Sequence, residues 1–335
     1  MWIRRISAIA ALCFTTTAVA DINLYSSRNE ALIQPLLNQF TDKTGIEVHL
    51  LTGKDDALLS RLKMEGAASP ADLLITADVA RLHRAKEMGL TQSVESTTLN
   101  RAIPSNLRDS DNHWFGMTSR ARPIIYAKDR VNPNQLSRYE SLADEEWKGR
   151  ICIRSSSNVY NQSLIASAIA ANGVEATEAW VKGLVANFAR PPAGGDTDQL
   201  KAAAAGVCDI AIANTYYLAR LVRSDKASDQ AVADQLAVFW PNQNDRGTHF
   251  NISGAALTAA SKNRDDAIAL LEYMVSEEAQ QWYAEVNNEY PVVNGVESSK
   301  VLKDFGTAKS DNVALSKLGE LNQEALRLMD RAGWK

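Results

Sequence analysis

Two kinds of apolar spacing alternate along this chain. Short apolar runs, rich in aliphatic and β-branched residues, predict strands at 22–26, 46–51, 72–76, 123–128, 151–154, 208–213 and 252–257. Apolar residues three and four positions apart predict helices at 30–43, 56–65, 163–171, 177–186, 198–205, 218–222, 265–276, 278–285 and 312–331. This alternation predicts an α/β protein with mainly parallel sheets. Pro35 conflicts mildly with the first helix, since a proline must kink a helix or lie in its first turn.

The length of the chain, 335 residues, allows two domains. Two α/β units in one chain indicate two lobes with a cleft between them. Ligands of such folds bind where strands end and helices begin, so we expect the binding residues at those junctions.

Composition and charge exclude several classes of protein. Apolar residues make up 45% of the chain and charged residues 23%, which is typical of a globular protein and not of a disordered or fibrous one. The formal charge of -4 gives no general cationic surface for nucleic acid or anionic lipid. We therefore expect no nucleic-acid partner, and any bound anion must be held by a local site. A monomer is expected.

The first twenty residues have the organisation of a secretory signal peptide. Two arginines precede an apolar run at 6–14, and Ala-Val-Ala at 18–20 fits a cleavage site. The run is too short to cross a bilayer, and no later run is long enough, so no membrane span is expected. Removal of residues 1–20 leaves a formal charge of -6 and two cysteines, Cys152 and Cys208. An even number in an oxidising compartment predicts one disulfide, with two buried free thiols as the alternative.

Motifs of the common enzyme classes are missing from the sequence. It contains no GxSxG, GxGxxG, GxxxxGK[ST] or HExxH pattern. None of its four histidines lies within helical reach of another histidine or a cysteine, so the sequence offers few closely spaced nitrogen and sulfur ligands for a zinc or copper site. These absences weaken the case for an enzyme without closing it, and we expect a protein that is not an enzyme.

Tyrosines follow two of the predicted strands. Tyr216 and Tyr217 lie between strand 208–213 and a helix, and Tyr160 has the same kind of position after strand 151–154. Free backbone N–H groups and the helix dipole favour negative charge at such junctions. A phenolate oxygen is a hard, charged ligand that suits a trivalent cation such as Fe³⁺. Ordinary half-buried packing is the alternative, and for an isolated Tyr-Tyr pair it is the better explanation.

Two arginines lie at comparable places. Arg28 follows the first strand, and Arg120 precedes strand 123–128, which would cross between the lobes. A guanidinium there can hold an oxyanion as a planar fork, or it can be a solvated charge or salt bridge.

Longer motifs around these residues resemble the periplasmic ferric ion-binding proteins, the bacterial transferrins that serve ABC iron importers. The matching stretches are NLYSSR, SPADLLITAD, HWFGMTSRAR, KGRICIRSSSNVYN, ARPPAGGDTDQLKAAAAGVCD, NTYYLARL, GTHFNISG and NNEYPV. The resemblance covers nearly the whole mature chain. It implies a two-lobed, type II periplasmic-binding-protein fold with hinge strands. The first lobe would comprise 21–119 plus 243–296, and the second 120–242 plus 297–335.

The resemblance also implies a site. It makes Tyr160, Tyr216 and Tyr217 the Fe³⁺ ligands, and Arg28 and Arg120 the residues that bind a synergistic carbonate. The charges agree, because three phenolates neutralise Fe³⁺ and two guanidinium groups balance a carbonate of charge -2.

The chain departs from some members of the family directly after the first strand. Those members place a histidine, or a histidine-tyrosine pair, where this chain has Ser-Arg-Asn-Glu at 27–30, which favours the carbonate-dependent arrangement. Tyr25 and Asn161 are further candidates for the site. Tyr25 lies within the predicted strand, where core packing explains it at least as well.

The implied partners are an inner-membrane ABC permease and its ATPase, and the implied location is the periplasm. If the strands that carry Cys152 and Cys208 are neighbours, their disulfide would fix both tyrosine loops relative to each other. Two other functions stay open from the residues: a receptor for another small anion or organic solute that uses Arg28 and Arg120 without iron, and an extracellular enzyme on the same scaffold.

Overall fold

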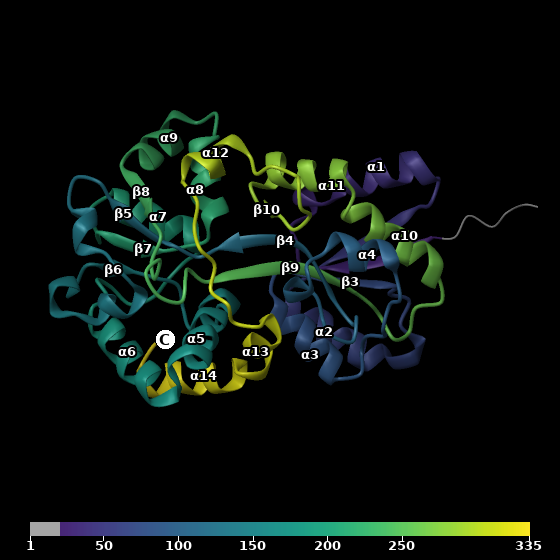
Figure 1. The fold of residues 1–335 in the computed structure, drawn as a ribbon, viewed down its shortest axis with the longest axis horizontal. Coiled ribbons are helices and arrows are strands. Elements are labelled where there is room, and N and C mark those ends of the chain that lie inside the picture. Colours follow the sequence, from purple (N-terminus) through teal and green to yellow (C-terminus); the bar gives the residue numbers. More distant parts are fainter. Residues whose placement is uncertain (1–20) are drawn as a thin grey trace, which may run out of the picture.

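Two separate β-sheets form the centres of two lobes (Figure 1). The computed structural model describes residues 21–335, and the expected signal peptide at 1–20 lies outside the described residues. The sheet of the first lobe has the strand order β10-β4-β9-β3-β1-β2, and that of the second lobe has the order β6-β7-β5-β8. Helices pack on both sheets, as in other α/β proteins.

The strands are β1 (Ile22–Ser26), β2 (Val48–Thr52), β3 (Leu73–Thr76), β4 (Phe115–Ala121), β5 (Ile124–Ala127), β6 (Ile151–Cys152), β7 (Ile210–Ile212), β8 (Leu236–Phe239), β9 (Phe250–Leu257) and β10 (Tyr290–Pro291). The α-helices are α1 (Gln34–Thr44), α2 (Asp55–Glu65), α3 (Val79–Glu87), α4 (Thr97–Ala102), α5 (Val159–Asn172), α6 (Val174–Ala186), α7 (Asp196–Ala204), α8 (Thr215–Val222), α9 (Ala227–Asp234), α10 (Arg264–Met274), α11 (Glu277–Trp282), α12 (Lys300–Asp304), α13 (Leu315–Glu320) and α14 (Asn322–Arg331). Short 3-10 turns lie at Glu30–Leu32, Gly66–Ala68, Ser105–Leu107, Pro133–Gln135, Tyr139–Ala143 and Glu145–Trp147, and a π-helical turn lies at Tyr283–Asn287.

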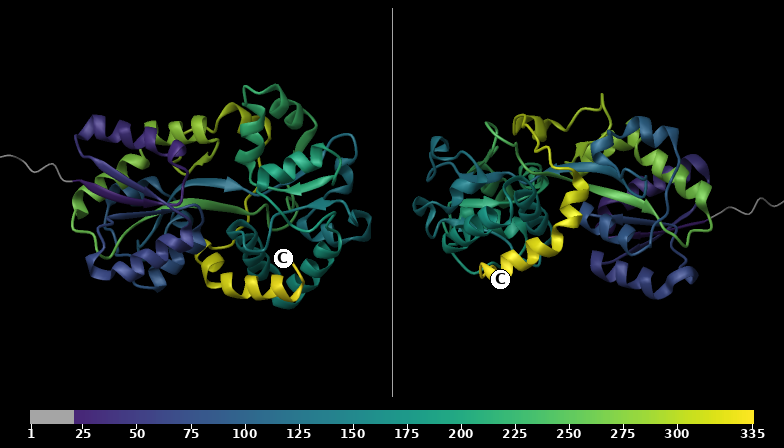
Figure 2. Two further views of the ribbon diagram at one scale, coloured as in Figure 1. Left: turned by 180° about the vertical axis from the view of Figure 1, so that it is seen from behind. Right: turned by 60° about the horizontal axis from the view of Figure 1, so that its bottom comes forward.

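Two long strands, β4 and β9, join the lobes. They pair antiparallel from Phe115 opposite Ala255 to Ala121 opposite Phe250, and Figures 1 and 2 show both running from the first lobe toward the second. The chain passes from the end of β4 directly into β5 of the second sheet. These strands are the hinge that the sequence led us to expect, although the crossing strand is β4 and not the predicted strand 123–128.

The expectation of mainly parallel sheets is wrong. Parallel pairing joins β1 to β2 and β3, and β6 to β7. In contrast, β9 pairs antiparallel with β3 and β4, β10 with β4, and β5 with β7 and β8. The reason lies in the hinge, because β4 carries the chain out of the first lobe and β9 returns it, so the two run in opposite directions.

Most predicted helices are present, with ends shifted by a few residues. Pro35 lies in the first turn of α1 and does not interrupt it. The predicted helix 312–331 is divided into α13 and α14. Strand β4 was not predicted as a strand because all seven of its residues are buried, so it lacks the alternation of a half-exposed strand.

The core of the second lobe continues toward the first lobe beside the hinge. Val79 and Leu82 of α3 belong to the same buried cluster as Leu315 and Leu318 of α13. Helix α13 thus packs against α3 of the first lobe as well as against α5, and Figure 2 shows the yellow C-terminal helices beside the two connecting strands. The lobe boundaries given above stay a prediction. Across residues 21–335, no helix has the length and hydrophobicity needed to cross a membrane.

Candidate functional site

The three predicted tyrosines lie together between the lobes. Tyr160 is in the first turn of α5, and Tyr216 and Tyr217 are in the first turn of α8. The rings of Tyr216 and Tyr217 are 4.5 Å apart between centroids. All three line a cavity of about 220 Å³, whose other walls are Ser27, Arg28, Asn29, Leu32, Ala77, Arg220, Ser253 and Glu289.

Parallel pairing of β6 and β7 explains why the tyrosines meet. Cys152 lies opposite Ala211 in this pair, so both strands deliver the chain to the same edge of the sheet. A disulfide between Cys152 and Cys208, with their Cα atoms 5.9 Å apart, ties the two segments together. The disulfide expected from the cysteine count is confirmed, and the two strands that lead to the tyrosine loops are neighbours.

Burial keeps the three phenols neutral. Loss of water is the largest cause that raises the pKa of Tyr160, Tyr216 and Tyr217 above the ordinary value of 10. A like charge on one neighbouring phenol raises each pKa further: Tyr217 acts on Tyr160, Tyr160 on Tyr216, and Tyr216 on Tyr217. A hydrogen bond with Tyr216 has the opposite effect and lowers the pKa of Tyr160. The phenols therefore become anionic only when a cation enters the site.

Guanidinium groups surround the rings of the three tyrosines. Arg120 lies 5.1 Å from the centroid of the Tyr160 ring, and Arg154 and Arg122 lie 5.8 and 5.9 Å from it. Their charge opposes the effect of burial, and Arg120 lowers the pKa of Tyr160 and Tyr216. Three guanidinium groups therefore lie close to one phenol ring, and carboxylates of Asp78 and Asp196 pair with them.

Arg28 lines the smaller cavity, and Arg120 lies against the Tyr160 ring without lining either cavity. Each of the two arginines is already paired with a carboxylate. Arg28 Nη2 lies 2.8 Å from Glu289 Oε2, and Arg120 Nη2 lies 2.9 Å from Asp78 Oδ2. Both pairs are buried. One nitrogen of each guanidinium, Nε of Arg28 and Nη1 of Arg120, has no hydrogen-bond partner among the described residues.

Asp78 also connects the lobes. Its Oδ1 accepts a hydrogen bond from Ser163 Oγ of α5 at 2.8 Å, while its Oδ2 accepts one from Asn251 Nδ2 of β9 at 3.0 Å. A carboxylate of the first lobe thus contacts the helix that carries Tyr160. Sequence reasoning missed Asp78 and Glu289, because neither adjoins the arginine it binds.

Arg220 is a further residue that sequence reasoning missed. It lies on α8, with its guanidinium 5.0 Å from the Tyr216 ring centroid and 5.6 Å from that of Tyr217. No carboxylate lies within 4.0 Å of it among residues 21–335. Its spacing of four residues from Tyr216 was the available signal, because residues i and i+4 of a helix are neighbours.

Tyr25 and Asn161 take part in other contacts. Tyr25 donates its hydroxyl to Glu65 at 3.0 Å and packs with Leu58 and Leu62 on the far side of β1. The side chain of Asn161 donates to the backbone oxygens of Arg154 and Ser155, at 2.9 and 3.2 Å, and so fixes the loop before Tyr160. Neither lines the cavity.

A wider cavity of about 620 Å³ adjoins the tyrosines. It shares Ser27, Ala77, Tyr160 and Tyr217 with the smaller one. Its other walls are Gly53, Lys54, Asp55, Asp56, Ala57, Arg81, Arg154, Ser155, Ser157, Asn158, Val159 and Gly194. Residues of both lobes line it, so it is the outer part of the cleft between them.

The usual metal-binding side chains form no cluster of their own among residues 21–335. Across the described part of the chain, no three histidine, cysteine, aspartate or glutamate side chains lie together as a metal site. The three phenols of Tyr160, Tyr216 and Tyr217 are thus the cluster of hard, ionisable oxygens that could hold a metal ion.

The family model for bacterial extracellular solute-binding proteins matches residues 68–309. This chain belongs to that family. Membership agrees with the expectation that the protein is not an enzyme.

Named relatives and solved structures are similar over most of the chain. Iron uptake protein A1 of Synechocystis is 50% identical over 315 residues, which cover 94% of this chain and 88% of the relative. The solved structure of Trichodesmium FutA (IdiA) in complex with iron and citrate superposes with a TM-score of 0.90 at 56% identity, covering 94% of this chain and all of that one. The ferric binding protein of Campylobacter jejuni has a TM-score of 0.91 at 42% identity, with coverages of 94% and 100%. These matches confirm the two-lobed, type II fold.

Proposed function

We propose that this chain is a periplasmic binding protein that captures Fe³⁺ with Tyr160, Tyr216 and Tyr217 and delivers it to an ABC importer. The observation that carries this function is the convergence of three phenols in one buried cavity between two lobes. Three phenolates carry the charge needed to neutralise Fe³⁺, and hard oxygen ligands suit this ion. The ferric and iron-uptake names of the relatives support the choice of metal.

A synergistic anion completes the coordination in this proposal. Three phenolate oxygens and two carbonate oxygens leave one position of an octahedron, which water would fill. Arg28, which lines the smaller cavity, and Arg120, which lies against the Tyr160 ring, would donate to the anion through nitrogens outside their ion pairs. Because the charges of both arginines are paired with carboxylates, Arg220 supplies further positive charge beside Tyr216.

Citrate is the alternative anion. The Trichodesmium structure contains iron and citrate ligands, and the wider cavity of about 620 Å³ has room for a polycarboxylate beside the phenols. Loading with ferric salt and either bicarbonate or citrate as the sole anion would distinguish the two.

Delivery requires export, closure and docking. Residues 1–20 would direct the chain to the periplasm and be removed there. Strands β4 and β9 would act as the hinge by which the lobes close on the ion. The closed form would then dock on an inner-membrane permease that works with its ATPase.

The visible spectrum tests the proposal. Purified protein given ferric nitrilotriacetate and bicarbonate should turn red to purple through phenolate-to-iron charge transfer. Replacing Tyr216 and Tyr217 by Phe should abolish the colour, whereas Tyr25→Phe, which removes a hydroxyl outside the cavity, should keep it. A colourless wild-type protein would refute ferric binding. Anion binding that survives the double replacement, without any iron, would favour the receptor for another small anion.

A further inference from the structure

Arg122 lies at the point where the hinge enters the second lobe. It follows the last residue of β4, Ala121, and precedes β5, which begins at Ile124. Only 2% of its surface is exposed. A buried guanidinium needs partners for its charge and its donors, and all the carboxylate and amide oxygens that bind this one belong to three helix starts.

The first partner is Asp196, the first residue of α7. Its Oδ2 lies 2.9 Å from Arg122 Nη1, and its Oδ1 lies 3.4 Å from Nη2. The same Oδ2 accepts a hydrogen bond from the backbone N–H of Asn214 at 3.1 Å. Asp196 thereby links the arginine to the residue that precedes α8.

The other two partners adjoin the tyrosines. Arg122 Nη2 donates to Asn161 Oδ1 at 2.7 Å, and Asn161 is the neighbour of Tyr160 in α5. Arg122 Nη1 donates to Asn214 Oδ1 at 3.0 Å, and the side-chain nitrogen of Asn214, Nδ2, donates to the Tyr216 hydroxyl at 3.1 Å. One planar group therefore connects the start of the helix with Tyr160 to the start of the helix with Tyr216.

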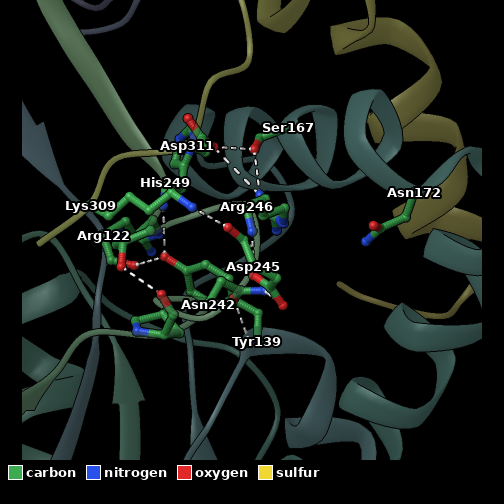
Figure 3. Close-up of polar contacts among 12 residues, drawn as sticks. Arg122, Tyr139, Ser167, Asn172, Asn242, Asp245, Arg246, His249, Lys309 and Asp311 are labelled. Carbon is green, nitrogen blue, oxygen red and sulfur yellow. Dashed lines mark hydrogen bonds and ion pairs between the residues drawn. The ribbon is translucent and has the colours of Figure 1, made fainter.

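The backbone of Arg122 is fixed from the opposite side. Tyr139 donates its hydroxyl to the Arg122 carbonyl oxygen at 2.7 Å and accepts from the backbone N–H of His249 at 3.3 Å (Figure 3). Arg122 N–H also donates to the His249 carbonyl oxygen at 3.1 Å. His249 directly precedes β9, so Arg122 is held where both hinge strands meet the second lobe.

We propose that Arg122 is a positioning residue, which sets the spacing of the three phenols and ties it to the hinge. This inference rests on the proposed ferric function. Arg122 differs from Arg120, because both its terminal nitrogens are bonded within the protein, whereas Nη1 of Arg120 has no partner among the described residues. Its loss would leave all three phenols present but spread their oxygens. Residues that orient ligands in this way typically contribute about 10- to 100-fold to metal affinity.

The experiment compares Arg122→Gln and Arg122→Lys with a matched control. Asp209 is the control position, because it also bridges two arginines of the second lobe, with Arg130 Nε at 2.8 Å and Arg150 Nε at 2.6 Å. It lies away from the tyrosines and does not line either cavity. Asp209→Asn thus weakens ion pairs of the same lobe, which are more exposed than that of Arg122, without touching the helix starts that carry the ligands.

Each variant is loaded with ferric nitrilotriacetate and bicarbonate, and iron release to a competing chelator is followed by the charge-transfer band. We expect Arg122→Gln to shift the band maximum and to release iron about 10- to 100-fold faster than wild type. Arg122→Lys should show a smaller band shift and a slower iron release than Arg122→Gln, since an ammonium retains a charge for Asp196. Asp209→Asn should lower the melting temperature while its band and release rate stay those of wild type.

Two results would overturn the inference: a wild-type band and release rate in Arg122→Gln, or the same spectral change in Asp209→Asn. If Arg122→Gln does not fold, Asp196→Asn replaces it, because the amide keeps the size of Asp196 and removes the charge that pairs with Arg122. The band maximum should then shift and iron release should quicken, and a wild-type band and release rate would count against the proposal. A colourless wild-type protein would overturn the ferric function itself, which distinguishes that failure from the failure of Arg122 as a positioning residue.

Discussion

Ferric ion should displace three protons when it binds to the buried phenols. Burial and the neighbouring phenols raise the pKa of Tyr160, Tyr216 and Tyr217 above 10, so all three are protonated at pH 6 to 8. Coordination by phenolate oxygen requires each proton to leave. If bicarbonate binds as carbonate, one more proton is released. We therefore expect three protons per ion with the phenols alone and four with carbonate.

The number of protons fixes how affinity depends on pH. A raised pKa means that acid favours the protonated, metal-free form, so affinity falls as pH falls and rises as pH rises. With three protons displaced, the binding constant changes by three powers of ten per pH unit. This corresponds to about 4 kcal/mol per pH unit, three times the ~1.4 kcal/mol that one proton contributes. Acid is thus an effective route to iron release.

Calorimetry in buffers of different ionisation enthalpy, at one fixed pH, measures the proton number. Ferric nitrilotriacetate is the iron source, and the free chelator titrated alone gives the correction for its own protons. Tyr160→Phe should reduce the number by one. Tyr25→Phe should leave it unchanged, because the Tyr25 hydroxyl binds Glu65 outside the cavity. A proton number that is the same in wild type and Tyr160→Phe would refute the assignment of Tyr160 as a ligand.

Three further changes test the surroundings of the site. Replacing Cys152 and Cys208 by Ser removes a cross-link between residues 56 positions apart; it should lower the free energy of unfolding in urea by ~4 kcal/mol, and an unchanged midpoint would contradict this. Arg28→Ala leaves Glu289 buried without its partner, which should lower the free energy of unfolding by about 3 to 5 kcal/mol. Adding Glu289→Gln should recover part of this loss. No recovery would show that the broken ion pair is not its cause. Arg220→Gln removes a cation near two phenol rings and should weaken ferric binding by about 0.5 to 2 kcal/mol in a chelator competition. Equal affinities would show that Arg220 does not contribute to ferric binding.

Local sequence patterns predicted the elements better than their arrangement. The spacing of apolar residues located most helices, and the position of Pro35 near a helix start proved compatible with α1. Strand direction depends on partners far away in the sequence, as in the pairing of β4 with β9. No local pattern contains that information, so the antiparallel share of both sheets was missed.

The same contrast between local patterns and contacts distant in sequence applies to the site. Tyr160, Tyr216 and Tyr217 were candidates because their place at strand-to-helix junctions is a local feature, and the strands that carry them are neighbours. Their assignment as iron ligands came from the family resemblance and stays a prediction. Tyr25 is adjacent in sequence to the binding loop, but the alternation of β1 directs its ring to the face that packs on α2. Whether a strand residue faces the cleft depends on the sheet as a whole.

The carboxylates that bind Arg28 and Arg120 show what a charge count from sequence leaves out. That count balanced two guanidinium groups against one carbonate, and so considered only the loaded site. A binding protein must also be stable before the ion arrives, when an unpaired buried guanidinium would cost several kcal/mol. Glu289 and Asp78 neutralise the two charges in that state, yet each leaves one nitrogen of its arginine without a partner. In the proposed loaded site, the anion would be bound by nitrogens outside these two ion pairs, so both pairs would stay intact when the ion arrives.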